Sequence, residues 1–447
     1  MPAPPSPSVA CSRPAAARAA LRRCHGSSRG VVYVAVLGAA LIVSLATLAA
    51  LHVARIESRG VRGVESRLRA EMAARSGIEA GLAWLAAHPD WRTTLVSGEE
   101  FPAKDWIELP GDARCRWQLS EEDGDFTDDD SETLRLRGIG RAGEAACVES
   151  VLLEPRGAAL DCLGAAIYAA RGVDVQDYWL RTDQLVGSGA DVKTAAWPDF
   201  IDADVEAAGN FLGNISSGHR SQTGARQRRM PGASAFDYYM AVGTPIALTS
   251  LPTVSGLRTL QRTTLAPGYN PFGPANPLGI YVIDCQGVSL RIRNLRIFGT
   301  LVLRRAGADT AIRENVHWEP AAPHLPALLA EGTINLSLFD YGLSESTYGI
   351  NFNPAGAPYA NQSDNDARDW YPPRFKGLIY ATDSVILKYD PLAYVVATGC
   401  LITNNLVVRD VLDFTYDPRH RNVPPPGFAR GSQLRPIPRT WQREAYD

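Results

Sequence analysis

The sequence lacks the short motifs that identify several classes of enzyme and metal-binding protein. It contains no Gly-x-Ser-x-Gly, no His-Glu-x-x-His and no phosphate-binding loop, and its 7 cysteines include no Cys-x-x-Cys pair. These absences argue against the matching hydrolases, metalloproteases, nucleotide-binding proteins and zinc ribbons. A charge excess is also missing, because 45 Lys and Arg oppose 48 Asp and Glu. No global positive field therefore favours nucleic acid as a partner.

Only one long apolar run occurs, which excludes a multi-span membrane protein. It covers residues 31–53, contains no Lys, Arg, Asp or Glu, and would reach about 35 Å as a helix, enough to cross a bilayer. Acidic residues are absent before Glu57, whereas residues 1–30 carry several arginines. This asymmetry predicts a cytoplasmic N-terminus and an outer position for the remaining chain. The run is longer than the apolar core of a cleaved secretory signal, so a plain signal anchor is one interpretation.

The helical pattern continues beyond the apolar run to about residue 91. Apolar residues recur there at steps of three and four positions, namely Val61, Val64, Leu68, Met72, Ile78, Leu82 and Leu85. The sequence His88-Pro89-Asp90 ends the pattern, because the residue before a proline disfavours the helical conformation. We therefore expect one helix that runs from the bilayer into an outer domain.

This N-terminal region resembles the PilX-like minor pilins, which belong to the type IV pilin-like (pseudopilin) proteins. Residues 28–33 (SRGVVY) are similar to the junction of a short basic leader with the apolar helix, and residues 73–82 (AARSGIEAGL) to the Ala-rich stretch after it. The resemblance implies that a prepilin peptidase cuts between Gly30 and Val31 and that the new N-terminus is methylated. Major pilins have Phe first and a Glu five residues after the cut, where this chain has Val31 and Ala35. Without that carboxylate the ion pair that sets subunit register is missing, so we expect a minor, tip or uncleaved component.

Residues 91–157 predict a small antiparallel β unit. Segments 114–119, 133–139 and 146–153 are alternating or apolar, with turns between them. The first two are separated by the acidic run EEDGDFTDDD at 121–130. Asp123, Asp125 and Asp128 have a spacing with which oxygen donors can ligate Ca²⁺, although the twelve-residue calcium loop is incomplete and a solvated hairpin loop is the alternative.

Two of the cysteines outside the membrane, Cys115 and Cys147, fall in this small unit on strands that the sequence suggests are neighbours. In an oxidising compartment they are candidates for a disulfide. Cys285 and Cys400 occur in apolar strand contexts and are expected to be buried as small hydrophobic residues.

A short sequence pattern repeats in the long segment that follows. Ile167-Tyr168 precedes Val173 and Val175, and Ile379-Tyr380 precedes Val385 and Leu387 at identical spacing; Ile280-Tyr281 opens a similar series. Such short strands cannot each bury a face alone, but a parallel solenoid would let each rung cover the one before. We therefore predict a parallel β-helix over residues 158–415, with a β-sandwich as the alternative.

Parallel β-helices often act on polysaccharides, so an enzyme has to be weighed. Asp174, Asp177 and Asp183 could supply the two carboxylates of a glycosidase, but their spacing matches no known signature. The basic residues 226–229 could contact an acidic polymer or form a solvated loop.

Together these observations predict an α+β chain with five parts. They are a cytoplasmic basic leader (1–30), a transmembrane and amphipathic pilin-like helix (31–90), a small β unit (91–157), a β-solenoid with long inserts (158–415) and a Pro-rich extended tail (416–447) held by Trp441.

We expect a single-pass protein of the bacterial inner membrane whose C-terminal domain is periplasmic or on the cell surface. The preferred function is that of a non-enzymatic minor pilin-like component of a type IV pilus or type II secretion-like apparatus, without catalytic residues or cofactors unless calcium binds. Its expected partners are the membrane, other pilin-like subunits and a prepilin peptidase, with a surface polysaccharide as a further candidate. A membrane-anchored polysaccharide-active enzyme and an adhesin are the alternatives.

Overall fold

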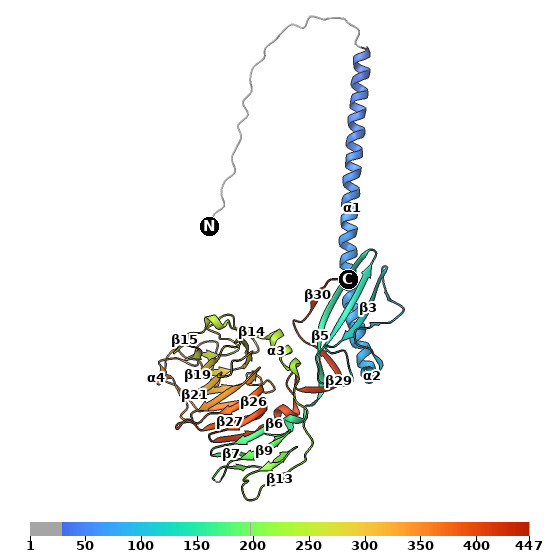
Figure 1. Ribbon diagram of the computed structural model, residues 1–447. Helices are drawn as coiled ribbons and strands as arrows, with labels where there is room; N and C mark the ends of the chain where they lie inside the picture. The colour runs from blue at the N-terminus through green and yellow to red at the C-terminus, as the bar shows by residue number, and fades with distance from the viewer. Residues whose placement is uncertain (1–28, 197, 447) are drawn as a thin grey trace, which may run out of the picture. The chain divides into compact units, whose positions relative to one another are not determined.

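The computed structural model describes residues 29–196 and 198–446, so most of the expected leader lies outside the described residues. The chain divides into two units, residues 1–65 and 66–447. Helix α1 (Arg29–Ala87) contributes to both, and a mainly-β region with mixed sheets follows it (Figure 1). A long N-terminal apolar helix followed by a mainly-β region is therefore confirmed. Pro89 stops the helix as expected, and the short helix α2 (Trp91–Thr94) comes next.

The small sheet is antiparallel and packs against the second half of α1. Its strands are β1 (Glu100–Phe101), β2 (Ile107–Leu109), β3 (Ala113–Ser120), β4 (Leu134–Ala142), β5 (Ala145–Ala159), β29 (Ala429–Pro436) and β30 (Gln442–Glu444). The three segments predicted from the sequence fall within β3, β4 and β5, except that the second begins one residue before β4. Trp91, Trp117, Leu134, Leu136 and Val151 are almost fully buried beneath the helix and form the core of this unit.

Small residues bring the helix and the sheet into close contact. Ala70 and Ala74 of α1 are fully buried. A Cβ atom added at Gly138 of β4 would lie 2.0 Å from the carbonyl oxygen of Ala74, and one at Gly140 would lie 2.1 Å from that of Ala70. Since the backbones touch at these points, only glycine fits at positions 138 and 140 of β4.

The C-terminal tail contributes two strands that the sequence did not predict. Residues 429–436 and 442–444 are strands that both pair with β5, and they complete the small sheet. The Trp441 side chain is 43% exposed. Hydrogen bonds connect the tail to the rest of this unit: Trp91 Nε1 donates to the carbonyl of Ser432 at 2.9 Å, and Arg435 Nε donates to Glu154 at 2.6 Å.

The segment between β5 and β29 consists mainly of short strands that pair in parallel along three ladders (Figure 1). The first ladder contains β14 (Thr244–Pro245), β18 (Ile280–Asp284), β20 (Thr300–Arg304), β22 (Leu328–Ala330), β26 (Arg374–Leu387), β27 (Val395–Val408), β6 (Ile167–Val175), β8 (Val186–Ser188), β11 (Val205–Ala207) and β13 (Ser221–Gln222). The second contains β16 (Leu257–Gln261), β19 (Leu290–Phe298), β21 (Ala311–Glu319), β23 (Ile334–Leu338), the second halves of β26, β27 and β6, then β9 (Asp191–Thr194) and β12 (Phe211–Leu212). The third contains β17 (Thr264–Leu265), the ends of β19 and β21, the starts of β26 and β27, β28 (Leu412–Tyr416), β7 (Trp179–Thr182) and β10 (Phe200–Asp202).

The remaining elements lie between these strands. They are β15 (Thr253–Val254), antiparallel to β16; β24 (Leu343–Ser344) with β25 (Trp370–Tyr371); the helices α3 (Asp237–Val242), α4 (Glu345–Tyr348) and α5 (Arg419–Asn422); and three 3₁₀ turns at Asp161–Gly164, Ala233–Phe236 and Leu248–Ser250.

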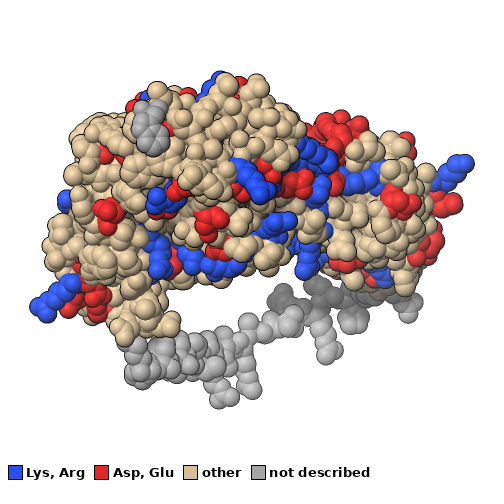
Figure 2. All heavy atoms as spheres, turned by 90° about the horizontal axis from the view of Figure 1, so that it is seen from below, with Lys and Arg blue, Asp and Glu red and all other residues tan. Residues whose placement is uncertain are grey.

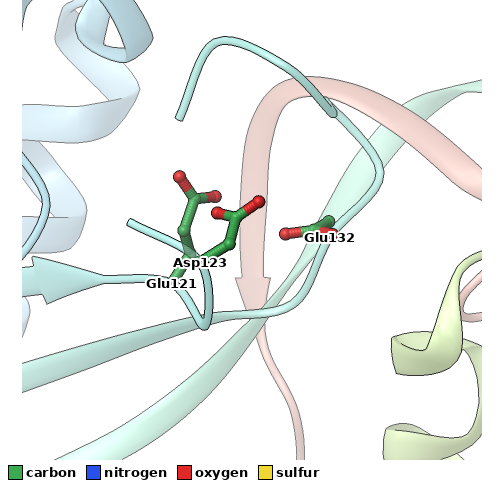
Figure 3. Close-up of side chains that lie close together, drawn as sticks. All are labelled: Glu121, Asp123 and Glu132. Atoms are coloured by element: carbon green, nitrogen blue, oxygen red, sulfur yellow. The ribbon is translucent and has the colours of Figure 1, made fainter. Parts of the chain in front are cut away.

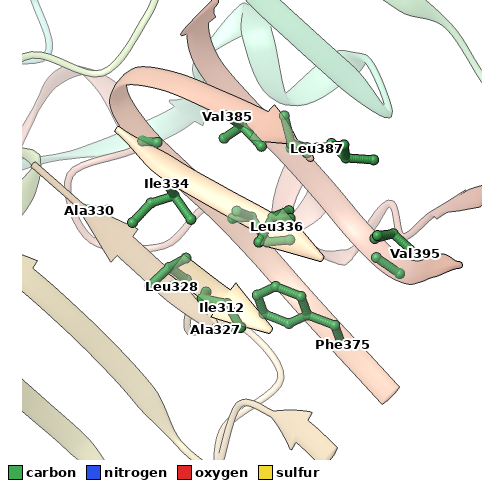
Figure 4. Close-up of a cluster of buried hydrophobic side chains, with 14 of the residues drawn as sticks. Ile312, Ala327, Leu328, Ala330, Ile334, Leu336, Phe375, Val385, Leu387 and Val395 are labelled. Atoms are coloured by element: carbon green, nitrogen blue, oxygen red, sulfur yellow. The ribbon is translucent and has the colours of Figure 1, made fainter. Parts of the chain in front are cut away.

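The residues of the repeated sequence pattern pair with one another in the register of these ladders. Ile379 pairs with Leu401, which pairs with Ile167, and Val385 pairs with Leu406, which pairs with Val173. The order of strands nevertheless departs from the order of the chain, since β27 near the C-terminus pairs with β6. Side chains from successive strands meet in one apolar core, part of which is shown in Figure 4. Fully burying a Leu or Ile contributes roughly 1.5–3 kcal/mol, so this core is the main source of stability for the region.

Candidate assembly helix and acidic sites

The first half of α1 exposes apolar side chains in every direction. Leu41, Ile42 and Val43 follow one another around the helix and are 63%, 68% and 61% exposed. Two hydroxyls in the same stretch are satisfied within the helix, because Ser44 Oγ donates to Ala40 O at 2.8 Å and Thr47 Oγ1 to Val43 O at 2.9 Å. A helix that is apolar all round needs a membrane or other apolar surfaces around it. Within the described residues, this is the one helix whose length and composition suffice to cross a membrane.

The predicted processing junction lies at the start of this helix. Gly30 and Val31 belong to the first turn of α1, which begins at Arg29. The leader before it is outside the described residues, so cleavage between Gly30 and Val31 stays a prediction. Ala35, where major pilins have Glu, is an exposed position of the same helix.

The acidic run folds differently from the calcium site that we predicted. Asp125 accepts hydrogen bonds from the backbone and hydroxyl of Thr127, at 2.9 and 2.7 Å, which lower the pKa of its carboxyl. Asp128 accepts one from the backbone of Asp129. Asp123 lies instead with Glu121 and Glu132, and carboxylate oxygens of these three residues lie within 4.8 Å of one another (Figure 3).

Glu121 is the member of this cluster whose carboxylate oxygens are buried. Both of its carboxylate oxygens are buried without a hydrogen-bond partner among the described residues. Burial, together with the charges of Asp123 and Glu132, raises the pKa of Glu121 to about 7. Arg92 opposes this shift, but its guanidinium donates elsewhere, to the carbonyls of Phe126 and Asp129 at 2.9 and 3.0 Å.

The basic cluster at 226–229 pairs with carboxylates of the same chain. Arg228 Nη2 lies 2.6 Å from Glu206 Oε2, and Arg229 pairs with Asp130 of the acidic run and lies 3.5 Å from Asp129. Other arginines pair with carboxylates across neighbouring strands, as Arg293 does with Glu314 at 2.7 Å. Basic and acidic side chains accordingly alternate on the face shown in Figure 2. Two of the three arginines of this cluster, Arg228 and Arg229, are therefore engaged by carboxylates of the chain itself.

The predicted disulfide is not realised. Cys115 and Cys147 are buried free thiols. Cys115 of β3 and Cys147 of β5 both pair with Gly140 of β4, so one strand lies between them. Strands two positions apart are separated by roughly 9–10 Å, beyond the reach of a disulfide. Cys285 and Cys400 are fully buried, as expected.

Two of the three carboxylates considered for catalysis, Asp174 and Asp183, have structural partners. Asp174 accepts a hydrogen bond from Gln176 at 2.6 Å, and Asp183 accepts one from the backbone of Tyr416 at 2.7 Å. A cavity of about 470 Å³ includes Asp174 and Asp191, but not Asp177 or Asp183. A hydrogen bond from the backbone of Asn210 lowers the pKa of Asp191, the opposite of what a general acid requires.

Sequence reasoning missed a second group of carboxylates, in the insert between β23 and β26. Glu345, Asp364 and Asp369 have oxygens within 4.8 Å of one another. They are widely spaced in the sequence, and the only signal was an excess of Asn and Asp at 351–369. Such a composition is also typical of turns, so it did not identify a site.

No family model and no curated protein matches the chain. Among solved structures, the chain is similar to the competence-associated pilin ComZ from Thermus thermophilus, with 9% sequence identity and a TM-score of 0.25. The similarity covers 86% of this chain and 97% of that one. An overlap with so low a TM-score carries no argument about fold or function.

Proposed function

We propose that the protein is a non-enzymatic, minor pilin-like component of a type IV pilus or type II secretion-like apparatus. One observation carries this proposal: a single helix is apolar on all sides in its first half and packs against an antiparallel sheet in its second half. The first half would reside in the inner membrane and then pack with the helices of other pilin-like subunits. Basic residues before it favour a cytoplasmic N-terminus and an outer position for the β-rich region.

The β-rich region would provide a surface at the outer end of this helix. We propose that its parallel ladders form a solenoid in which each rung covers its neighbour, as the register of Ile167 with Leu401 and Ile379 supports. The position of Ala35 favours a minor component, because a helix without the Glu lacks the carboxylate that would pair with a neighbouring N-terminal amine. Non-enzymatic display of a surface fits the partners of Asp174 and Asp183 better than catalysis does.

The first experiment is mass spectrometry of the N-terminal peptide from purified membranes. A start at Val31 with an N-methyl group would support processing by a prepilin peptidase. Gly30→Val should abolish this peptide, whereas the control Gly38→Val, in a position with open space around it, should not. An intact Met1 in the unaltered protein would overturn the processing step and leave an anchored surface protein. A start near Ala54 would overturn the membrane role altogether.

A further inference from the structure

The insert at 339–373 forms a compact lobe on the ladders. Its own small core contains Leu343, Phe352 and Tyr371, each 0% exposed. The buried guanidinium of Arg296 on β19 donates to three backbone carbonyls of the insert, those of Phe352, Ala357 and Pro358, at 2.6–2.8 Å. The hydrogen bonds of Arg296 therefore go to carbonyl oxygens and not to the carboxylates of the lobe.

Three carboxylates meet in this lobe, and of these only Glu345 is buried. Glu345 is 0% exposed, and its oxygens lie within 4.8 Å of those of Asp364 and Asp369. The hydrogen bonds that Glu345 accepts come from neutral donors: the backbone of Phe352 at 2.6 Å, the backbone of Asp369 at 3.0 Å and the hydroxyl of Tyr371 at 2.8 Å. Negative charge is therefore concentrated here without a bonded cationic side chain in the described part of the lobe.

A buried amide points into the same place. Asn353 is 2% exposed, its Nδ2 lies 2.9 Å from Asp369 Oδ2 and 3.5 Å from Asp364 Oδ2, and its Oδ1 has no hydrogen-bond partner. An orphaned buried amide oxygen is costly, about 1–3 kcal/mol. Rotating the amide by half a turn would exchange its oxygen and nitrogen. The amide oxygen would then face the oxygens of Asp364 and Asp369, at separations typical of two ligands of one calcium ion, roughly 3–4 Å.

We propose that this lobe binds one divalent cation, Ca²⁺, through the carboxylates of Glu345, Asp364 and Asp369 and the amide oxygen of Asn353. The donors are all hard oxygens with three negative charges, which suits Ca²⁺. They come from an irregular loop rather than from an octahedral cage, which disfavours Mg²⁺. Bound calcium would join α4 to the segment before β25 and so close the lobe.

Terbium luminescence in the full-length, detergent-solubilised protein tests this proposal. Tb³⁺ replaces Ca²⁺ and is sensitised by nearby aromatic rings, here Trp370 next to Asp369 and Tyr371 bonded to Glu345. Every protein in this experiment, including the otherwise unaltered one, carries Asp123→Asn, which removes one carboxylate from the cluster with Glu121 and Glu132. We expect a saturable signal that Ca²⁺ displaces at much lower concentration than Mg²⁺. The double variant Asp364→Asn, Asp369→Asn should lower Tb³⁺ affinity at least tenfold, whereas the control Asp366→Asn, which changes an exposed neighbour paired with Arg368, should leave it unchanged.

Trypsin cleavage after Arg368, whose side chain is 85% exposed, supplies a second readout. Ca²⁺ should slow this cleavage several-fold in the unaltered protein and in Asp366→Asn, but not in the double variant. A variant that fails to fold would be recognised by rapid cleavage throughout the chain, and Asn353→Ala then takes its place, with a loss of Tb³⁺ affinity expected. Absence of the signal in the unaltered protein, or equal affinity in the double variant, would overturn the proposal.

Discussion

The two halves of α1 differ in the size of their side chains and in what surrounds them. Residues 33–64 present Leu, Val and Ile that stay more than half exposed in most positions. From Ala70 onward, the helix instead buries Ala and Gly against β3 and β4, where backbone atoms approach directly. In the first half, large side chains give the helix an apolar surface where it has no protein neighbour. In the second half, small residues let the helix backbone pack tightly against the sheet. One helix can therefore serve as a membrane anchor and as part of a folded core.

Adding methyl groups to β4 should disrupt the packing between the second half of α1 and the sheet most strongly. Gly138→Ala together with Gly140→Ala should cost at least about 3 kcal/mol or prevent folding, since both Cβ atoms would overlap backbone atoms of α1. The midpoint of urea unfolding measures this. Gly232→Ala, whose Cβ would come no closer than 3.8 Å to its neighbours, is the control. Equal midpoints for the two proteins would contradict the close helix–sheet contact.

A charge tests the exposed half. Leu45→Asp should reduce membrane retention, because an Asp at the centre of a membrane helix costs about 2.5–3.5 kcal/mol. The measurement is the fraction of protein that resists extraction from membranes by alkaline carbonate. Met72→Asp, at a 69% exposed position beyond the apolar run, should be retained like the unaltered protein. If Leu45→Asp were retained equally well, the membrane role of this half would be wrong.

Two glycines of α1 provide a matched pair. A Cβ at Gly77 would lie 2.5 Å from Arg116 O, whereas one at Gly63 would meet nothing within 4 Å. Gly77→Ala should therefore destabilise the protein by about 1–2 kcal/mol. Gly63→Ala should stabilise the helix by up to about 1 kcal/mol, because Ala is the better helix former. Thermal midpoints of the two variants should move in opposite directions, and a shared direction would refute the contrast.

The smallest expected effect concerns Glu121 beside the packed half. Its pKa is raised to about 7 when folded, above its value of about 4.3 in an unfolded chain. The folded state therefore binds the proton more tightly, and stability falls as the pH rises between these values. Glu121→Gln should gain about 1 kcal/mol at pH 8, after allowing for solvent screening, and nothing at pH 4. Thermal midpoints at both pH values measure this, with the exposed Glu122→Gln as control. A gain of equal size at both would refute the role of ionisation.

The sequence predicted the elements whose signals are local. Apolar steps of three and four gave α1, and alternation gave β3, β4 and β5. The identical sequence patterns that begin at Ile167 and Ile379 occupy equivalent positions in the first ladder, where both residues pair with Leu401. These features depend on side chains close together in the chain, so a single sequence contains them.

The misses involve partners that are distant in sequence. Strand β29 has a polar sequence with no alternating burial, and it forms because β5 offers an edge and Glu154 accepts from Arg435. Cys115 and Cys147 appeared to be neighbours because strand order cannot be read from spacing. The sequence also did not show which acidic residues meet: Asp125 bonds to Thr127 in its own turn, while Glu132 lies near Asp123 from a later turn.

The ladders begin and end at one place on the small sheet. Ala159 pairs with Ala429, and the backbone of Leu160 donates to Phe428 at 3.0 Å. The two strands that flank the insertion are thus already joined as if by a hairpin, and a short turn could replace everything between them without changing the register of the sheet. The pairing of β5 with β29 therefore does not depend on how long the inserted segment is.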